Sequence, residues 1–277
     1  MAAAPPYIGA MQASLVLNVS ALVSMLPVSA LALKRPLERS GLFWLLLAVA
    51  VAGPAVAAID KVAQGWLSSL SAALWLIIVA SLVMFAVVNA ATTHGWRLAP
   101  LLLPYLFLLG IGAAVTEFVP PAAPIVPPDR WAEVHVLVAV TTYGLLTLAA
   151  VAGFAVYLQE RALKRRRPSA LTALLPSVAD AEQLQITLLG ASALVLGLGL
   201  ITGAATQYVE TGHVIEVSHK TVFAVTAFVV IVLLVLINQR TGLRGRRATQ
   251  FILAAYLMLM LASPGVKFVT DVILARA

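Results

Sequence analysis

The sequence contains no cysteine and few charged residues, and both scarcities limit what the chain can be. Without a thiol, the chain has no disulfide, no thiolate metal site and no thioether link to a prosthetic group, so any metal ligand must be histidine, methionine or oxygen. Only 10% of the 277 residues are charged, whereas 62% are hydrophobic, and the mean hydropathy is +1.01. These values lie far outside the range of soluble domains. The sequence therefore predicts an integral membrane protein.

Motifs of nucleotide-driven and hydrolytic enzymes are also missing. The sequence has no phosphate-binding Gly-x-x-x-x-Gly-Lys loop, no Gly-x-Ser-x-Gly elbow and no His-Glu-x-x-His helix. We therefore do not expect enzymatic activity from the chain on its own.

Long apolar stretches recur along the whole chain. A helix needs roughly 20 apolar residues to cross about 30 Å of hydrocarbon, and these stretches lack the alternating pattern of barrel strands. We predict an all-α polytopic membrane helical bundle that forms a single transmembrane domain over residues 1–277. About eight spans are expected, over approximately residues 8–33, 41–59, 67–90, 98–118, 131–158, 185–206, 219–238 and 248–270.

The distribution of Lys and Arg predicts the orientation, because inner loops of membrane proteins are enriched in cations. With both termini outside, 13 of the 18 cations lie on the inner side. The inner cations are Lys34, Arg35, Arg39, Arg97, Arg161, Lys164, Arg165, Arg166, Arg167, Arg240, Arg244, Arg246 and Arg247. The remaining five are Lys61, Arg130, Lys220, Lys267 and Arg276. This topology, with attraction of the inner loops to anionic lipid, explains the net charge of +7, so no nucleic-acid partner is expected.

Two loops and a few polar or small residues complete the pattern. The proline-rich outer segment 120–130 suits an extended cover, and the inner segment 159–185 suits an amphipathic interfacial helix. Glycines at 197, 199 and 203 indicate close helix packing on the sixth span. Glu117 is expected to lie near water at the outer end of the fourth span.

Two histidines stand at the outer ends of two different spans. His135 begins the fifth span and shares a helical face with Trp131, and His219 begins the seventh span. Because neutral imidazole nitrogen binds haem iron, two such residues on facing helix ends are candidate axial ligands of one haem b. Trp131 offers a stacking wall for the porphyrin.

Other cations and histidines near the membrane faces can support this haem site or replace one of its ligands. Arg130, Lys220 or Lys267 can neutralise haem propionates at the same level. The alternative is that His135 and His219 are interfacial residues that cap helix starts or bind lipid headgroups. His213, in an outer loop, can substitute as a ligand, whereas His94 is expected at the inner side, where Trp96 and Arg97 are headgroup anchors.

Three segments in this order resemble a known family. They are residues 131–145 (Trp-Ala-Glu-Val-His-Val-Leu-Val-Ala-Val-Thr-Thr-Tyr-Gly-Leu), residues 157–164 (Tyr-Leu-Gln-Glu-Arg-Ala-Leu-Lys), and residues 198–203 (Leu-Gly-Leu-Ile-Thr-Gly) leading to His219-Lys220-Thr221. The pattern is similar to the cytochrome c assembly transmembrane family (CcsA/CcmC-like), and more narrowly to its HemX-like and YpjD-like branch. The resemblance is best over residues 131–270.

The resemblance implies a haem-handling protein of the bacterial inner (plasma) membrane, multi-pass, which acts in haem transport or cytochrome c-type biogenesis with other assembly or membrane subunits. In that family His135 matches the first external haem histidine. The tryptophan-rich segment that precedes the later histidine helix in full haem-delivery members is missing before His219, and Asn238 stands near one place where such members carry a histidine within the membrane. We therefore expect that the protein binds haem but does not itself attach haem covalently to cytochrome c.

Two other functions remain open at this point. One is a non-catalytic membrane scaffold or regulatory subunit with the same fold and no haem. The other is a small-molecule or ion transporter, which is disfavoured because the spans have almost no charge at mid-depth.

Overall fold

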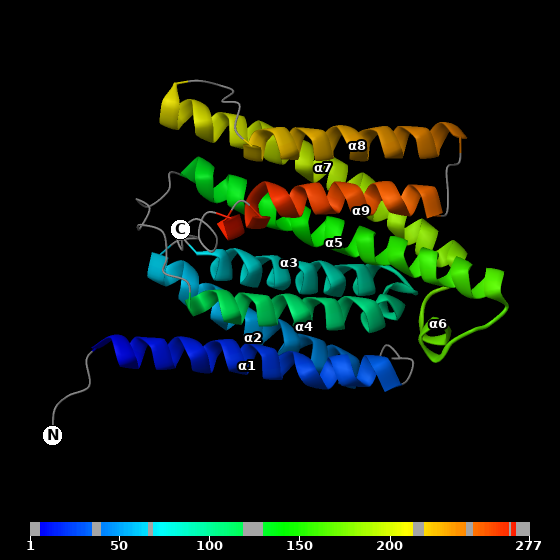
Figure 1. The fold of residues 1–277 in the computed structure, drawn as a ribbon, viewed down its shortest axis with the longest axis horizontal. Helices are drawn as coiled ribbons and strands as arrows, with labels where there is room; N and C mark the ends of the chain where they lie inside the picture. Colours follow the sequence, from blue (N-terminus) through cyan, green and yellow to red (C-terminus); the bar gives the residue numbers. More distant parts are fainter. Residues whose placement is uncertain are drawn as a thin grey trace.

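The computed structural model describes residues 6–34, 40–65, 69–118, 130–212, 219–241, 246–265 and 267–269, and every regular element within these ranges is helical (Figure 1). The first half contains α1 (Pro6–Lys34), α2 (Gly41–Gly65), α3 (Leu70–Ala91), η1 (Gly95–Leu98), α4 (Ala99–Val115) and η2 (Thr116–Phe118). The second half contains α5 (Arg130–Arg165), α6 (Ala170–Leu174), α7 (Val178–Thr211), α8 (His219–Thr241), α9 (Arg246–Met260) and the π-helical turn η3 (Leu261–Gly265).

The predicted all-α membrane fold is confirmed, with differences in helix length. Within the described ranges, seven helices are long and apolar enough to cross a membrane, and α9 is a shorter apolar helix that η3 prolongs. At the end of α9, Pro264 has no N–H to donate to a carbonyl one turn earlier, which explains why regular α-helix stops at Met260.

The inner segment predicted as one interfacial helix is built differently. α5 continues to Arg165 and α7 begins at Val178, so only the five-residue α6 remains between them. Residues 159–165 are good helix formers that prolong α5, and Ser169 caps α6 in a capping box. The outer segment predicted as a cover lies, up to residue 129, outside the described residues.

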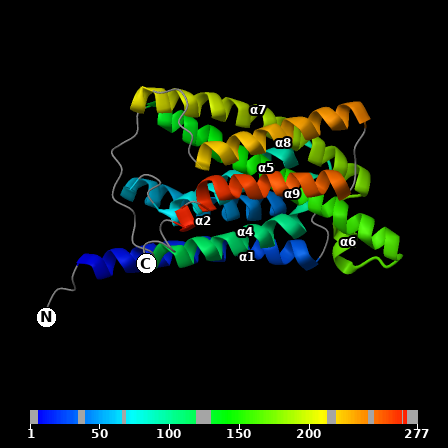
Figure 2. The same cartoon turned by 45° about the horizontal axis from the view of Figure 1, so that its top comes forward.

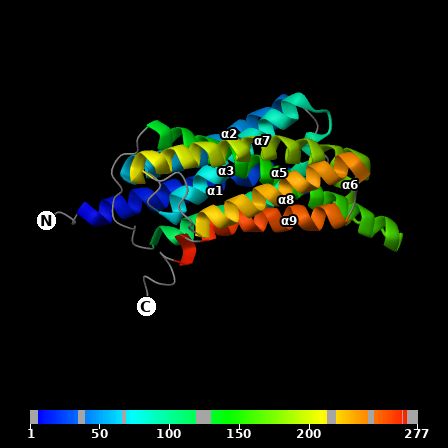
Figure 3. The same cartoon turned by 90° about the horizontal axis from the view of Figure 1, so that it is seen from above.

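The helices run antiparallel along one long axis (Figure 1). One end of the bundle carries the starts of α1, α3, α5 and α8; we call it the His135 end. The opposite end, with α6, is the Arg165 end. Helices α1 to α4 pack together, as do α5, α7, α8 and α9, and the main contact between the two groups is α3 against α5 (Figures 2 and 3). Gly144 permits this contact, because a Cβ there would lie 2.9 Å from the Ala80 carbonyl oxygen.

Apolar side chains cover the outside of the bundle as well as its interior. Leu137 is 69% exposed, Leu194 75% and Ile201 67%, although each belongs to a long helix. Such surfaces are stable against acyl chains and not against water. The chain is therefore a multi-pass membrane protein in lipid contact.

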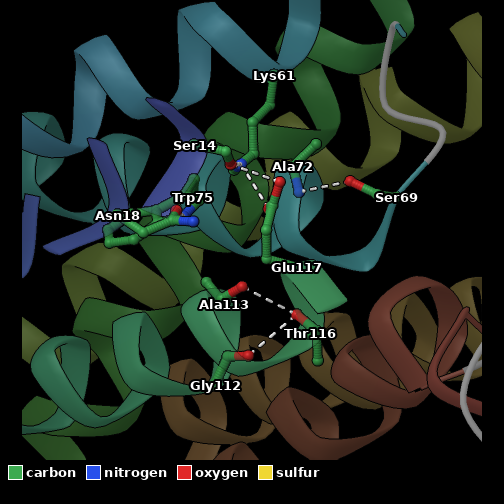
Figure 4. Close-up of polar contacts among 10 residues, drawn as sticks. All are labelled: Ser14, Asn18, Lys61, Ser69, Ala72, Trp75, Gly112, Ala113, Thr116 and Glu117. Atoms are coloured by element: carbon green, nitrogen blue, oxygen red, sulfur yellow. Dashed lines mark hydrogen bonds and ion pairs between the residues drawn. The ribbon is translucent and has the colours of Figure 1, made fainter. Parts of the chain in front are cut away.

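A buried ion pair joins the helices of the first group at the His135 end (Figure 4). Lys61 of α2 and Glu117 of η2 lie 2.5 Å apart, with side-chain exposures of 4% and 24%. Ser14 of α1 bridges them: its hydroxyl donates to Glu117 Oε1 at 2.6 Å and accepts from Lys61 Nζ at 3.0 Å. One turn deeper, Trp75 Nε1 donates to Asn18 Oδ1 at 2.8 Å. Four sequence-distant segments are thus tied by polar contacts.

The pair keeps Glu117 ionised. Burial raises the pKa of this carboxyl, but hydrogen bonds from Lys61 and Ser14 and the charge of Lys61 lower it more, so the net pKa lies below its ordinary value. Glu117 lies at the end of its span and stays partly exposed, as expected, but its pairing with Lys61 was not predicted. In the sequence, a single Lys at the end of one span and a single Glu at the end of another do not reveal that the two side chains pair.

Breaking this ion pair on one side should destabilise the bundle more than removing both charges. Glu117→Gln leaves a buried ammonium and should cost on the order of 3 kcal/mol. Lys61→Met should cost less, because Glu117 is more exposed and keeps Ser14. The double variant should lie within about 1 kcal/mol of the parent. Unfolding of the four proteins in detergent measures these values; additive single effects would mean that the two charges do not interact.

Candidate functional site

His135 lies in the second turn of α5 and faces α7. Residues 131, 135, 138 and 142 recur at helical spacing, and two of them contact α7 directly: Val138 approaches Gly199, and His135 approaches Gly203. The contact between α5 and α7 is the most extensive between helices in the described structure. The histidine is therefore held at a tight helix interface, and it is only partly exposed.

One ring nitrogen of His135 is occupied by α7. His135 Nδ1 lies 3.1 Å from the Gly199 carbonyl oxygen and 3.2 Å from Thr202 Oγ1. The Thr202 hydroxyl itself donates to the Gly199 carbonyl at 3.1 Å. A carbonyl oxygen only accepts, so Nδ1 must carry the proton in this contact. In the neutral ring Nε2 then has its lone pair free.

Glycine at position 203 makes room for the ring. A Cβ at Gly203 would lie 3.0 Å from His135 Cε1 and 3.3 Å from Nδ1, closer than ordinary contacts allow. At Gly199 a Cβ would lie 3.5 Å from Val138, and at Gly197 it would lie 3.3 Å from Phe228 of α8. The prediction that these glycines serve close helix packing is confirmed. The packing at Gly203 also forms a cradle for the imidazole.

The other predicted site residues occupy the same end of the bundle. Arg130 and Trp131 begin α5, and the Trp131 side chain is 49% exposed. His219 and Lys220 begin α8, which packs against α7, but their side chains lie outside the described residues, as does all of His213. The pairing of His135 with His219 stays a prediction.

His94 lies at the opposite end, as predicted. It precedes η1, and its Nε2 is 3.9 Å from Asp180 Oδ1 at the start of α7. The Arg97 guanidinium lies over the Trp96 ring at 5.1 Å, consistent with an anchor at a headgroup interface. His94 is therefore separated from His135 by the length of the bundle.

A tyrosine cluster lies two turns deeper than His135, and the sequence alone did not indicate it. The Tyr143 hydroxyl donates to the Leu259 carbonyl at 2.8 Å, near the end of α9. The hydroxyls of Tyr105 and Tyr256 are hydrogen-bonded, and Thr147 donates to Tyr256 at 3.2 Å. This cluster joins α4, α5 and α9 beneath the histidine and fixes the depth of α5.

The donor set suits a ligand that needs one or two histidines. Among the described residues, no three His, Asp or Glu side chains come together in a way that could hold a metal ion. His135 instead presents a single imidazole. Its Nδ1 is held by a backbone carbonyl, and this contact orients Nε2, an arrangement found for histidines that ligate metals. The fold and site together define a polytopic helical membrane protein with an oriented histidine at one membrane face.

Comparison with known proteins assigns the family. Residues 35–274 match the model of the cytochrome C assembly protein family, so the match includes helices α2 to α4 as well as the second half. The chain is also 47% identical over 272 residues to an Azospirillum brasilense protein described as an uncharacterized 28.8 kDa protein in the nifR3-like 5' region, covering 95% of this chain and 100% of that relative. No solved structure matches the chain significantly.

The chain belongs to the cytochrome c assembly protein family, and its role lies in cytochrome c biogenesis.

The cradle around His135 is testable without any ligand. Gly203→Ala should push the ring away from the Gly199 carbonyl and destabilise the protein by about 1–3 kcal/mol through overpacking. Gly190→Ala, in the same helix where nothing lies within 4 Å of the added Cβ, should be neutral or stabilising by up to about 1 kcal/mol. Thermal unfolding and the ¹⁵N signals of His135 report the two effects. Equal behaviour of both variants would contradict the cradle.

Proposed function

We propose that this protein binds haem b at the outer face of the bacterial inner membrane through His135 and His219, and that it takes part in haem trafficking for cytochrome c maturation. The proposal rests on family membership and on the geometry of His135.

The hydrogen bond from His135 Nδ1 to the Gly199 carbonyl is the observation that carries the proposal. It selects the tautomer in which Nε2 is unprotonated, which is the form that coordinates iron. A histidine that only caps a helix or contacts lipid headgroups has no need for a fixed tautomer. The Gly203 cradle further limits rotation of the ring.

The residues at the His135 end suit the different parts of a haem. His135 would hold the iron on one side. His219, at the start of α8, which packs against α7, is proposed for the other side. Arg130 and Lys220 suit the propionates, and Trp131 suits the porphyrin face. When bound, haem supplies the iron centre that cytochromes c need; the protein supplies orientation and exclusion of water.

The same site is poorly suited to joining haem to an apocytochrome. The last tryptophan in the sequence is Trp131, so the segment that leads into α8 contains no tryptophan. Ligation needs the porphyrin edge held toward an incoming peptide. We therefore place the protein in haem storage or transfer to a partner subunit.

Absorption spectra of the detergent-purified protein test the proposal. The parent should show the Soret band of six-coordinate haem, and His135→Ala or His219→Ala should give a five-coordinate or depleted spectrum. His94→Ala is the matched control and should keep the parent spectrum, because His94 lies at the Arg165 end.

Two results would contradict the assignment. Loss of haem from His94→Ala equal to that from His135→Ala would mean that the ligands are misidentified. A folded parent that stays colourless after haem addition, yet co-purifies with a membrane partner, would favour the scaffold function over haem binding.

A further inference from the structure

The Arg165 end of α5 extends past its neighbours into the headgroup region. With 36 residues α5 is about 54 Å long, whereas the hydrocarbon core is about 30 Å thick. Figures 1 and 3 show this end beyond α8 and α9. Phe154, which is 41% exposed, stacks on Tyr157 with ring centroids 6.1 Å apart. Such aromatic pairs mark the membrane–water interface, so the residues that follow lie among lipid headgroups.

Five exposed cations follow within two turns, and none of them has a carboxylate partner among the described residues. They are Arg161, Lys164, Arg165, Arg166 and Arg167. In the part of the chain that the structure describes, no Asp or Glu oxygen lies within 4.0 Å of their nitrogens, since the ion pairs found there involve Lys61 and His94. Like charges at this spacing repel. Binding of an external anion would therefore reduce the repulsion within this cluster.

The backbone holds these cations in place at an energetic cost. α5 ends in a Schellman turn, in which Arg167 N–H donates to the Ala162 carbonyl at 3.2 Å and Arg166 N–H donates to the Leu163 carbonyl at 3.1 Å. Arg166 has φ +50°, a left-handed conformation that favours glycine. An arginine at this position sacrifices stability for a cation, which is the pattern expected where the charge has a function.

A second contact fixes the connection to α7. The Gln159 side chain donates to the carbonyls of Thr172 and Pro176, both at 2.9 Å. The segment that leaves the cation cluster is thereby tied back to α5. The cations thus lie on a turn whose position is fixed by hydrogen bonds. The general enrichment of inner loops in Lys and Arg does not require such a fixed turn.

A half-open hollow of about 360 Å³ lies on the same face of α5. It is lined by Tyr157, Glu160, Arg161, Lys164 and Arg165. Guanidinium groups bind phosphate oxygens through paired hydrogen bonds. The Glu160 carboxylate disfavours a dianionic phosphomonoester and offers an acceptor for hydroxyl groups. A phosphodiester with hydroxyls beside it fits both features.

We propose that this hollow binds the headgroup of an anionic glycerophospholipid of the inner leaflet, with phosphatidylglycerol as the matching chemistry. Arg161, Lys164 and Arg165 hold the phosphodiester, Glu160 accepts from the glycerol hydroxyls, and Tyr157 lies at the acyl boundary. The site is at the end of α5 opposite to His135, so it stands apart from the proposed haem function.

Native mass spectrometry of the full-length protein, titrated with phosphatidylglycerol or phosphatidylcholine in detergent, tests the site. The triple variant Arg161→Gln, Lys164→Gln and Arg165→Gln should bind phosphatidylglycerol roughly 10- to 100-fold more weakly. The matched control, Lys34→Gln, Arg240→Gln and Arg246→Gln, removes three cations from the same end and should bind like the parent. Phosphatidylcholine should bind weakly to all three proteins.

Three outcomes would overturn the proposal. They are an unchanged affinity in the triple variant, an equal loss in the control, which would mean diffuse charge without a site, and competition by soluble glycerol phosphate at the same concentration as the lipid, which would mean a soluble ligand.

Arg166→Gly provides a second measurement that does not depend on a multiple variant. Glycine relieves the left-handed strain, so the melting temperature in phosphatidylcholine should rise, while the additional stabilisation by phosphatidylglycerol should shrink. A rise that is equal in both lipids would mean that the strained conformation of Arg166 does not serve lipid binding, and it would overturn the proposal.

Discussion

Inside hydrocarbon, each polar group needs a partner within the protein, and this requirement organises the whole structure. Helices satisfy the backbone, hydroxyls such as those of Ser29 and Ser81 donate to a carbonyl one turn earlier in their own helix, and several other polar side chains are satisfied by contacts between helices. Lys61 finds Glu117 and Ser14, Trp75 finds Asn18, and Tyr143 finds the Leu259 carbonyl at the end of α9. Each of these contacts joins segments far apart in the sequence, so the same bonds that remove the cost of burial also determine which helices are neighbours.

His135 follows the same rule with a chemical consequence. Its Nδ1–H is satisfied by the Gly199 carbonyl, which leaves Nε2 as the unprotonated ring nitrogen. Gly203 makes room for this contact, because a Cβ there would lie 3.0 Å from His135 Cε1, closer than ordinary contacts allow. The same contact between α5 and α7 therefore determines the packing of the two helices, the tautomer of His135 and the proposed role of His135 as an iron ligand.

α5 connects the two membrane faces as a single rod. Its first turns carry the oriented histidine, and its last turns carry Arg161, Lys164 and Arg165 beyond the aromatic pair at the opposite interface. A headgroup bound at the Arg165 end would fix the depth and tilt of α5 in the bilayer. The same rod holds His135 against α7, so the depth of the histidine in the bilayer depends on both ends.

Much of the fold was predictable, because hydropathy reports directly on lipid exposure. Seven of the eight predicted spans, the membrane class and the packing role of the α7 glycines follow from composition and spacing, whereas the eighth predicted span is a shorter apolar helix. Partners across the sequence were not predictable. His135 and Gly199 are 64 residues apart and Tyr105 and Tyr256 are 151 apart, and no local pattern encodes such pairs. The true length of α5 was also missed, because hydropathy measures the hydrocarbon crossing while helix propensity continues through charged residues.

The direction of α5 in the membrane is the central claim, because haem at the outer face and anionic lipid at the inner face both depend on it. The natural absence of cysteine gives a clean background for labelling. Arg130→Cys and Arg165→Cys should each be treated, in intact and in permeabilised spheroplasts, with a maleimide that does not cross membranes. The account predicts labelling at 130 in intact spheroplasts and at 165 only after permeabilisation. The reverse pattern would place His135 at the inner face and contradict the account.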